Sequence, residues 1–111
     1  MLDYHLSMLH DTARTDAYRR AITATVRPGD VVVDIGCGSG VLSFMACEAG
    51  ARKVYAIESG PVIGLARELA IDNGFADRIE FVEGWSTEVE LPELGDVLVT
   101  VESEVISVDR E

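Results

Sequence analysis

The chain has 111 residues, of which 48% are hydrophobic, and it carries a formal net charge of -11 at pH 7. This length allows one domain with a modest core, and the hydrophobic content argues against disorder. The acidic balance disfavours nucleic acid as a direct partner, and no apolar run approaches the ~20 residues needed to cross a bilayer. Two cysteines form neither a disulfide framework nor a zinc set, and the N-terminus shows no signal segment, so we expect a cytoplasmic protein without a metal site.

The charge is unevenly distributed along the chain. Residues 1–82 hold eleven acidic and eight basic residues, whereas residues 83–111 hold nine acidic residues and a single base, Arg110. A cationic substrate or a basic partner surface would suit this acidic segment, although acidic loops also serve solubility alone.

Hydrophobic spacing and turn residues predict alternating helices and strands. Turn-forming residues at 27–30, at Gly50 and at 73–74 interrupt the helical spacing and end the helices. We expect helices at about 11–26, 39–50 and 61–73, and strands at about 30–35, 53–58, 78–83 and 96–101. Apolar strands alternating with helices predict an α/β fold with a parallel sheet.

Residues 31–40, VVVDIGCGSG, form the centre of the predicted fold. A β-branched run leads into three alternate glycines, which allow a tight turn and close approach of a ligand, and the free N–H groups of the following helix suit a nucleotide-like molecule. A dinucleotide fingerprint, G-x-G-x-x-G, would need glycine where Val41 stands. The pattern D-x-G-x-G-x-G, beginning at Asp34, resembles instead the nucleoside-binding loop of the class I, S-adenosylmethionine (AdoMet) dependent methyltransferases, although glycine turns join strands to helices in many other α/β folds.

Two further segments follow the second and third expected strands. Glu58 ends the second strand, which lies beside the first in such a fold, and a carboxylate there can accept hydrogen bonds from both ribose hydroxyls. The loop at 84–87 leaves the third strand where an adenine ring would lie, so Trp85 either stacks on the ring or belongs to the core.

The residues before the first strand narrow the resemblance. Residues 4–18, YHLSMLHDTARTDAY, resemble the N-terminal helix signature of the protein arginine methyltransferases, in which Met-Leu, Asp and Arg-Thr precede the nucleotide domain. The similarity continues through residues 34–43, 49–51, 54–58 and 89–92. It implies a Rossmann-like class I methyltransferase half-fold with sheet order 3-2-1-4, made of a helical cover (1–29) and an AdoMet-binding α/β domain (30–111) within one domain overall.

The resemblance also implies roles for individual residues. Met8 and Arg14 would cover AdoMet, the arginine pairing with the methionine carboxylate, while Glu58 would hold the ribose. Ser86 and Thr87 would flank the adenine. The residues expected to contact AdoMet, or its product S-adenosylhomocysteine (AdoHcy), are Met8, Arg14, Asp34, Gly36, Cys37, Gly38, Gly40, Leu42, Glu58, Ser59, Gly84, Trp85, Ser86 and Thr87.

The expected acceptor site departs from the family pattern. The family follows its fourth strand with Ser-Glu-Trp-Met-Gly and a second glutamate, and the two carboxylates grip the substrate guanidinium. Here residues 100–111 lack Trp-Met-Gly, and Glu102, Glu104 and Glu111 are the candidate catalytic carboxylates. The rest of the family's sheet, its His-containing loop and its C-terminal β-barrel are not in this sequence.

A sheet of order 3-2-1-4 would leave the fourth strand, at about residues 96–101, as an open apolar edge. We therefore expect a homo-oligomer or a partner chain that pairs with this strand, while Val105, Ile106 and Val108 either extend it or form another strand.

Three functions are compatible with these observations. The first is an AdoMet-dependent methyltransferase that transfers a methyl group to a nitrogen of a basic, arginine-like protein or small-molecule acceptor. The second is a non-catalytic AdoMet-binding module or regulatory subunit that lacks the substrate half. The third is a structural relic that no longer binds the cofactor, and the intact glycine loop and Glu58 argue against it.

Overall fold

The computed structural model describes residues 12–102 and 105–110. Its elements in chain order are α1 (Thr12–Thr25), β1 (Val31–Ile35), α2 (Val41–Glu48), β2 (Lys53–Glu58), α3 (Ile63–Asp72), β3 (Ile79–Glu83), β4 (Val97–Glu102) and β5 (Val105–Arg110). Every expected helix and strand is present close to its predicted bounds, and β5 is an additional strand. None of the helices in this part of the chain is both long and apolar enough to span a membrane.

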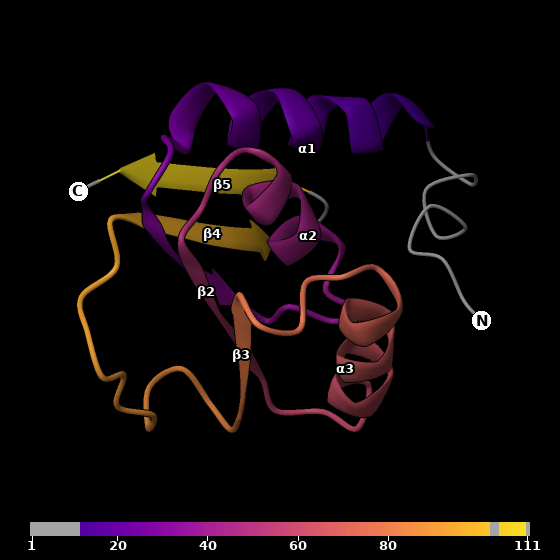
Figure 1. Ribbon diagram of the computed structural model, residues 1–111, viewed down its shortest axis with the longest axis vertical. Coiled ribbons are helices and arrows are strands. Elements are labelled where there is room, and N and C mark those ends of the chain that lie inside the picture. Colours follow the sequence, from indigo (N-terminus) through magenta and orange to yellow (C-terminus); the bar gives the residue numbers. More distant parts are fainter. Residues whose placement is uncertain (1–11, 103–104, 111) are drawn as a thin grey trace.

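The five strands form one sheet in the order β3-β2-β1-β4-β5 (Figure 1). The first four are mutually parallel, as expected, and β5 runs antiparallel to β4. The prediction that residues 96–101 form an open edge for a second copy or another chain is therefore wrong, because β4 already lies between β1 and β5. Only two residues separate β4 from β5 in the sequence, so pairing within the chain has a small loop-closure cost.

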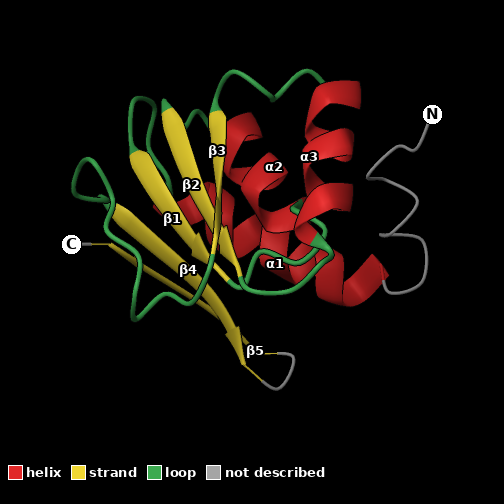
Figure 2. Cartoon of the chain, turned by 90° about the horizontal axis from the view of Figure 1, so that it is seen from below, coloured by secondary structure: helices red, strands yellow, loops and turns green. Residues whose placement is uncertain are grey.

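The core lies between the sheet and its helices. All three helices cover the same face of the sheet (Figure 2), and no described helix covers the other face. Val32, Val54 and Val97 point from adjacent strands into this core, and the aromatic ring of Phe44 in α2 stacks on that of Phe75. Packing of one apolar sheet face against amphipathic helices is the physical basis of the layered architecture.

Helix α2 follows the glycine loop, and its position is fixed at both ends. Gly40 begins it with a φ of 92°, and the carbonyl of Gly40 accepts the N–H of Phe44 at 3.0 Å. At the other end the Arg78 guanidinium donates to the carbonyls of Cys47 and Ala51, each at 2.6 Å. These two bonds connect the end of α2 and the turn after it to Arg78, just before β3, and so hold α2 against the sheet.

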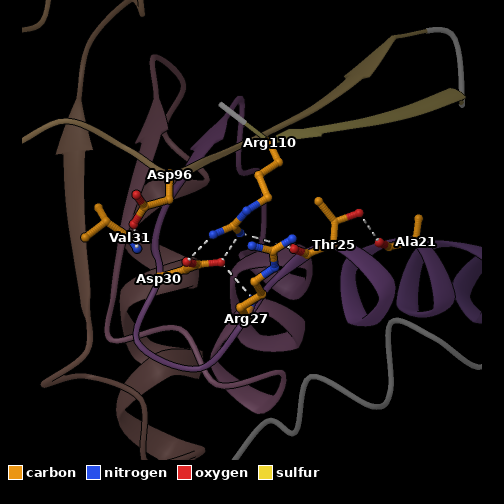
Figure 3. A network of polar contacts seen from close by, with 7 residues as sticks. All are labelled: Ala21, Thr25, Arg27, Asp30, Val31, Asp96 and Arg110. Carbon is orange, nitrogen blue, oxygen red and sulfur yellow. Dashed lines mark hydrogen bonds and ion pairs between the residues drawn. The ribbon is translucent and has the colours of Figure 1, made fainter.

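A network of charged groups closes the amino-terminal end of the sheet (Figure 3). The carboxylate of Asp30 accepts both guanidinium nitrogens of Arg110 and the backbone N–H of Arg27. Arg110 also donates to the carbonyl of Thr25 at 3.3 Å. The end of α1, the start of β1 and the end of β5 are thereby tied together.

Candidate functional site

The glycine loop between β1 and α2 is fixed on one side and open on the other. The backbone N–H groups of Gly36 and Cys37 both donate to the carbonyl of Ile57 in β2, at 2.8 and 3.0 Å. Gly36 and Gly38 have φ angles of 69° and 55°, which favour glycine, and a Cβ built on either would meet no atom within 4 Å. The loop therefore presents bare backbone to open space, where a ligand can approach closely.

Glu58 lies at the end of β2 and is bonded to this loop. Its Oε1 accepts the N–H of Gly38 at 2.8 Å, and its Oε2 accepts the N–H of Gly60 at 2.9 Å. Each carboxylate oxygen can accept a second hydrogen bond. The two bonds fix the orientation of the carboxylate and leave one acceptor position on each oxygen, which matches the two adjacent hydroxyls of a ribose.

Asp34 of β1 lies beneath the loop and is fully enclosed. Its side chain is 1% exposed, and its Oδ2 accepts the hydroxyl of Ser43 in the first turn of α2 at 2.7 Å. Burial, with a smaller contribution from the negative charge of Glu58, raises the pKa of this carboxyl to about 6, although the Ser43 hydrogen bond opposes the rise. The site therefore contains an acid that titrates near neutral pH.

The loop after β3 lies beside Glu58. The N–H of Gly84 donates to the carbonyl of Glu58 at 3.0 Å, and Trp85 follows with 65% of its surface exposed. The alternative that Trp85 belongs to the core is therefore wrong. Ser86 and Thr87 are also exposed, so the three side chains expected around an adenine ring face solvent at this edge.

The remaining predicted contacts near the loop differ in their surroundings. Ser59 is exposed next to Glu58, and Leu42 is half-buried in the first turn of α2. Cys37 is buried, and burial raises its thiol pKa to about 12, so the group stays protonated and unreactive at neutral pH. Within the described ranges, no group of three or more His, Cys, Asp or Glu side chains could hold a metal ion.

The structure describes only some of the residues predicted to cover AdoMet or to hold the acceptor. Arg14 lies in α1 and is half-buried. Glu102 is the last residue of β4, at the same end of the parallel strands as Glu58. Met8, Glu104 and Glu111 lie outside the described residues.

The sequence analysis did not predict a role in the site for Ser43 or Gly60, although the sequence around each residue contains a clue. Ser43 is a polar residue within the apolar helical run VLSFMAC, which suggests a specific partner for its hydroxyl. Gly60 belongs to the turn Ser59-Gly60-Pro61 immediately after Glu58, and a Cβ there would lie 3.1 Å from Glu58 Oε2. A glycine at this point allows the backbone to approach the carboxylate.

A parallel sheet of order 3-2-1-4, a glycine loop after the first strand and an acid ending the second define the Rossmann-like fold of the class I AdoMet-dependent methyltransferases. A family model described as "Ribosomal protein L11 methyltransferase (PrmA)" matches residues 10–101. The chain belongs to this methyltransferase family.

Individual relatives are named as arginine methyltransferases. The chain is 40% identical over 92 residues to the ribosomal protein arginine N-methyltransferase rmt3 of Schizosaccharomyces pombe, covering 81% of this chain and 17% of that protein. It is 44% identical over 100 residues to the protein arginine N-methyltransferase PRMT10 of rice (Oryza sativa subsp. japonica), covering 87% and 26%. The chain thus spans about a sixth to a quarter of the length of these two relatives.

A solved structure agrees with the sequence relatives. The structure superposes with a TM-score of 0.79 on a chain of the Trypanosoma brucei PRMT1 enzyme-prozyme heterotetrameric complex with AdoHcy. The sequence identity is 40%, and the superposition covers 87% of this chain and 31% of that one.

Proposed function

We propose that this chain binds AdoMet and acts as the cofactor-binding part of a methyltransferase whose acceptor is an arginine-like nitrogen. The observation that carries the proposal is Glu58, whose two oxygens are oriented by the N–H groups of Gly38 and Gly60 beside the open glycine loop. The relatives named as arginine methyltransferases support the acceptor class.

The residues present fit AdoMet. The second acceptor positions on Glu58 suit the ribose hydroxyls, and exposed Trp85 with its neighbours 86–87 suits the adenine. The bare backbone at Gly36 and Gly38 suits the methionine part. AdoMet supplies an electrophilic methyl group on its sulfonium. The contribution of the chain is to bind and orient the cofactor, because in-line methyl transfer depends mainly on positioning.

The acceptor would be held by acidic groups. We propose that Glu102, at the carboxyl end of β4, and Glu104 just beyond it hold a guanidinium beside the cofactor. A carboxylate at this position would orient the guanidinium, stabilise its positive charge and accept the proton that the nitrogen loses on methylation. Glu111 is not part of this proposal, because the residue before it, Arg110, pairs with Val97 at the amino-terminal end of the sheet. Arg14 and Met8 are proposed to cover the cofactor as parts of the helical segment 1–29, whose described helix α1 packs on α2 and β5.

Calorimetric titration with AdoMet and AdoHcy tests the cofactor site. Replacing Glu58 by alanine should weaken binding by about 1–3 kcal/mol, the cost of losing a charged hydrogen-bond partner. Glu83 is the matched control, because it pairs with Glu58 in register at the end of β3 and is exposed, so Glu83→Ala should bind as the wild type does. Failure of the folded wild-type protein to bind either compound would refute the proposal.

Methyl transfer separates an enzyme from a binding module. An arginine-containing peptide incubated with labelled AdoMet should become labelled, and Glu102→Gln should reduce the rate without changing AdoMet affinity. Binding without transfer to any basic acceptor would leave the non-catalytic module as the function.

The setting of the protein is also a proposal. We place it in the cytoplasm, which its buried free cysteines Cys37 and Cys47 support, because thiols persist in a reducing compartment. We further propose an oligomer, most simply a dimer of identical chains, since the similar Trypanosoma brucei chain is part of a heterotetramer. Since β5 occupies the edge next to β4, such an assembly would use another surface, and the mass in solution measures it.

A further inference from the structure

Asp34 is a buried acid that the proposed binding contacts leave unexplained. It lies between the uncharged residues Ala56 of β2 and Val99 of β4 in the sheet, and Ser43 of α2 is the residue that bonds its carboxyl. The other titratable groups that face it are Glu58 of β2 and the thiol of Cys37 in the loop. Among the described residues, no basic side chain is bonded to this carboxyl.

The balance of forces leaves Asp34 close to a change of protonation. Burial disfavours the carboxylate and raises its pKa to about 6, while the Ser43 hydrogen bond favours the carboxylate and limits the rise. The charge on Glu58 acts in the same direction as burial. The thiol of Cys37, with its pKa raised to about 12, remains neutral over the range in which Asp34 titrates.

A positive ligand placed over the loop would change this balance. AdoMet carries a sulfonium, an ammonium and a carboxylate, so it is a net cation, whereas AdoHcy lacks the sulfonium charge. A cation above a buried acid stabilises its ionised form and favours loss of its proton.

We propose that AdoMet binding drives off the proton carried by the protonated fraction of Asp34 and releases it to solvent. The site would then distinguish cationic AdoMet from AdoHcy, whose sulfur is uncharged, in a pH-dependent manner. The inference rests on the proposed AdoMet site. Before binding, the carboxyl of Asp34 is partly protonated; after binding, it is a carboxylate whose charge opposes that of the sulfonium. The resemblance implied that Asp34 contacts AdoMet, but Asp34 is 1% exposed, so we assign it a charge-matching role beneath the loop in place of a direct contact.

The test is the pH dependence of affinity, measured by calorimetry with AdoMet and with AdoHcy. From about pH 5 to about pH 7 the ionised fraction of an acid with this pKa rises from about a tenth to about nine-tenths, so AdoMet should bind about tenfold more tightly at the higher pH. AdoHcy should show a smaller change. At each pH the titration is repeated in two buffers that differ in ionisation enthalpy. The difference between the two measured heats gives the number of protons released on binding.

Two variants isolate the acid. Asp34→Asn keeps the shape and an acceptor for Ser43, and it should abolish the difference in pH dependence between AdoMet and AdoHcy. His5 and His10 are present in both proteins, so only the difference between variant and wild type is assigned to Asp34. Ser43→Ala removes the bond that favours the carboxylate and should move the midpoint to higher pH.

The wild-type protein offers a readout that needs no variant. The carboxyl carbon of Asp34, followed by NMR, should titrate at lower pH when AdoMet is present. Tight binding with an unchanged Asp34 midpoint, or the same pH dependence in Asp34→Asn, would overturn the proton coupling and leave the cofactor site standing. Absence of AdoMet binding at every pH would overturn the coupling and the proposed function together.

Discussion

Asp30 and Asp34 lie at opposite ends of β1, and their surroundings shift the pKa values of their carboxyls in opposite directions. Asp30, at the amino-terminal end, is held by Arg110 in the network of Figure 3, and this hydrogen bond keeps the pKa of its carboxyl below its ordinary value of 3.8. Asp34, at the carboxyl-terminal end, has a hydroxyl as its side-chain partner, and burial raises its pKa to about 6. At the amino-terminal end, Asp30 is paired with a cation of the protein itself. At the carboxyl-terminal end, Asp34 has no such cation among the described residues, and a cationic ligand can supply the positive charge.

The two acids contribute to stability with opposite signs. Asp30 has a lowered pKa in the folded state, so it stabilises the fold above pH 3.8 and the contribution is lost as the pH falls through the lowered value. Asp34 has a raised pKa, so its ionisation opposes folding, with no penalty below pH 3.8 and the full penalty above about pH 6. Each end of β1 can therefore be tested separately.

The largest effect is expected at Asp34. A rise in pKa from 3.8 to about 6 corresponds to about 3 kcal/mol, so Asp34→Asn should stabilise the ligand-free protein by about that amount at pH 8. The gain should vanish below pH 3.8. Urea denaturation at several pH values measures it, and a destabilised variant at pH 8 would contradict the assignment.

The opposite sign is expected at Asp30. Replacing it by asparagine weakens the contacts to Arg110 and to the Arg27 N–H, and should cost about 1.5–3 kcal/mol at pH 7. In acid the variant and the wild type should converge, since both side chains are then uncharged. Equal stability of the two proteins at pH 7 would show that the network of Figure 3 contributes nothing.

Packing at the amino-terminal end can be tested at Gly95, just before β4. A Cβ there would lie 2.7 Å from Val33 Cγ2, so Gly95→Ala should destabilise the protein by about 1–2 kcal/mol, less than full overpacking because half-buried Val33 can shift. AdoMet affinity should not change. Thermal unfolding and calorimetry together check both expectations.

Gly38, in the glycine loop, should affect AdoMet affinity more than stability. Gly38→Ala would place its methyl group in open space at a φ of 55°, at a cost of about 1 kcal/mol in stability. Its main effect should be weaker AdoMet binding, because the methyl group occupies the bare face of the loop. Unchanged affinity would indicate that the ligand does not approach Gly38.

The sequence predicted the α/β core because each element carried its own local signal. Each element can be recognised from its own residues and their immediate neighbours. Examples are the β-branched run of β1, the glycines that follow it and Glu58 at the end of β2. β5 was left undecided because its apolar residues, Val105 among them, fit either a longer β4 or a separate strand.

The tertiary contacts of the site were harder to predict. The bond from Gly38 to Glu58 joins the loop after β1 to the end of β2, and no local pattern specifies it, whereas the bond from Gly60 lies within the turn that follows Glu58. The Asp34–Ser43 pair spans a strand and the next helix, and the pairing of Asp30 with Arg110 joins residues 80 apart in the sequence. Such contacts depend on the packing of the sheet and not on local propensity.

Backbone amide NMR with added AdoHcy tests the central claim that the carboxyl-terminal end of the sheet is the cofactor site. The amide signals of Gly36, Gly38, Gly60 and Gly84 should shift on titration, because these N–H groups lie in the loops around Glu58. Those of Gly29 and Gly95, at the other end of the sheet, should not. Shifts confined to the amino-terminal end, or none at millimolar AdoHcy, would contradict the assignment of this site.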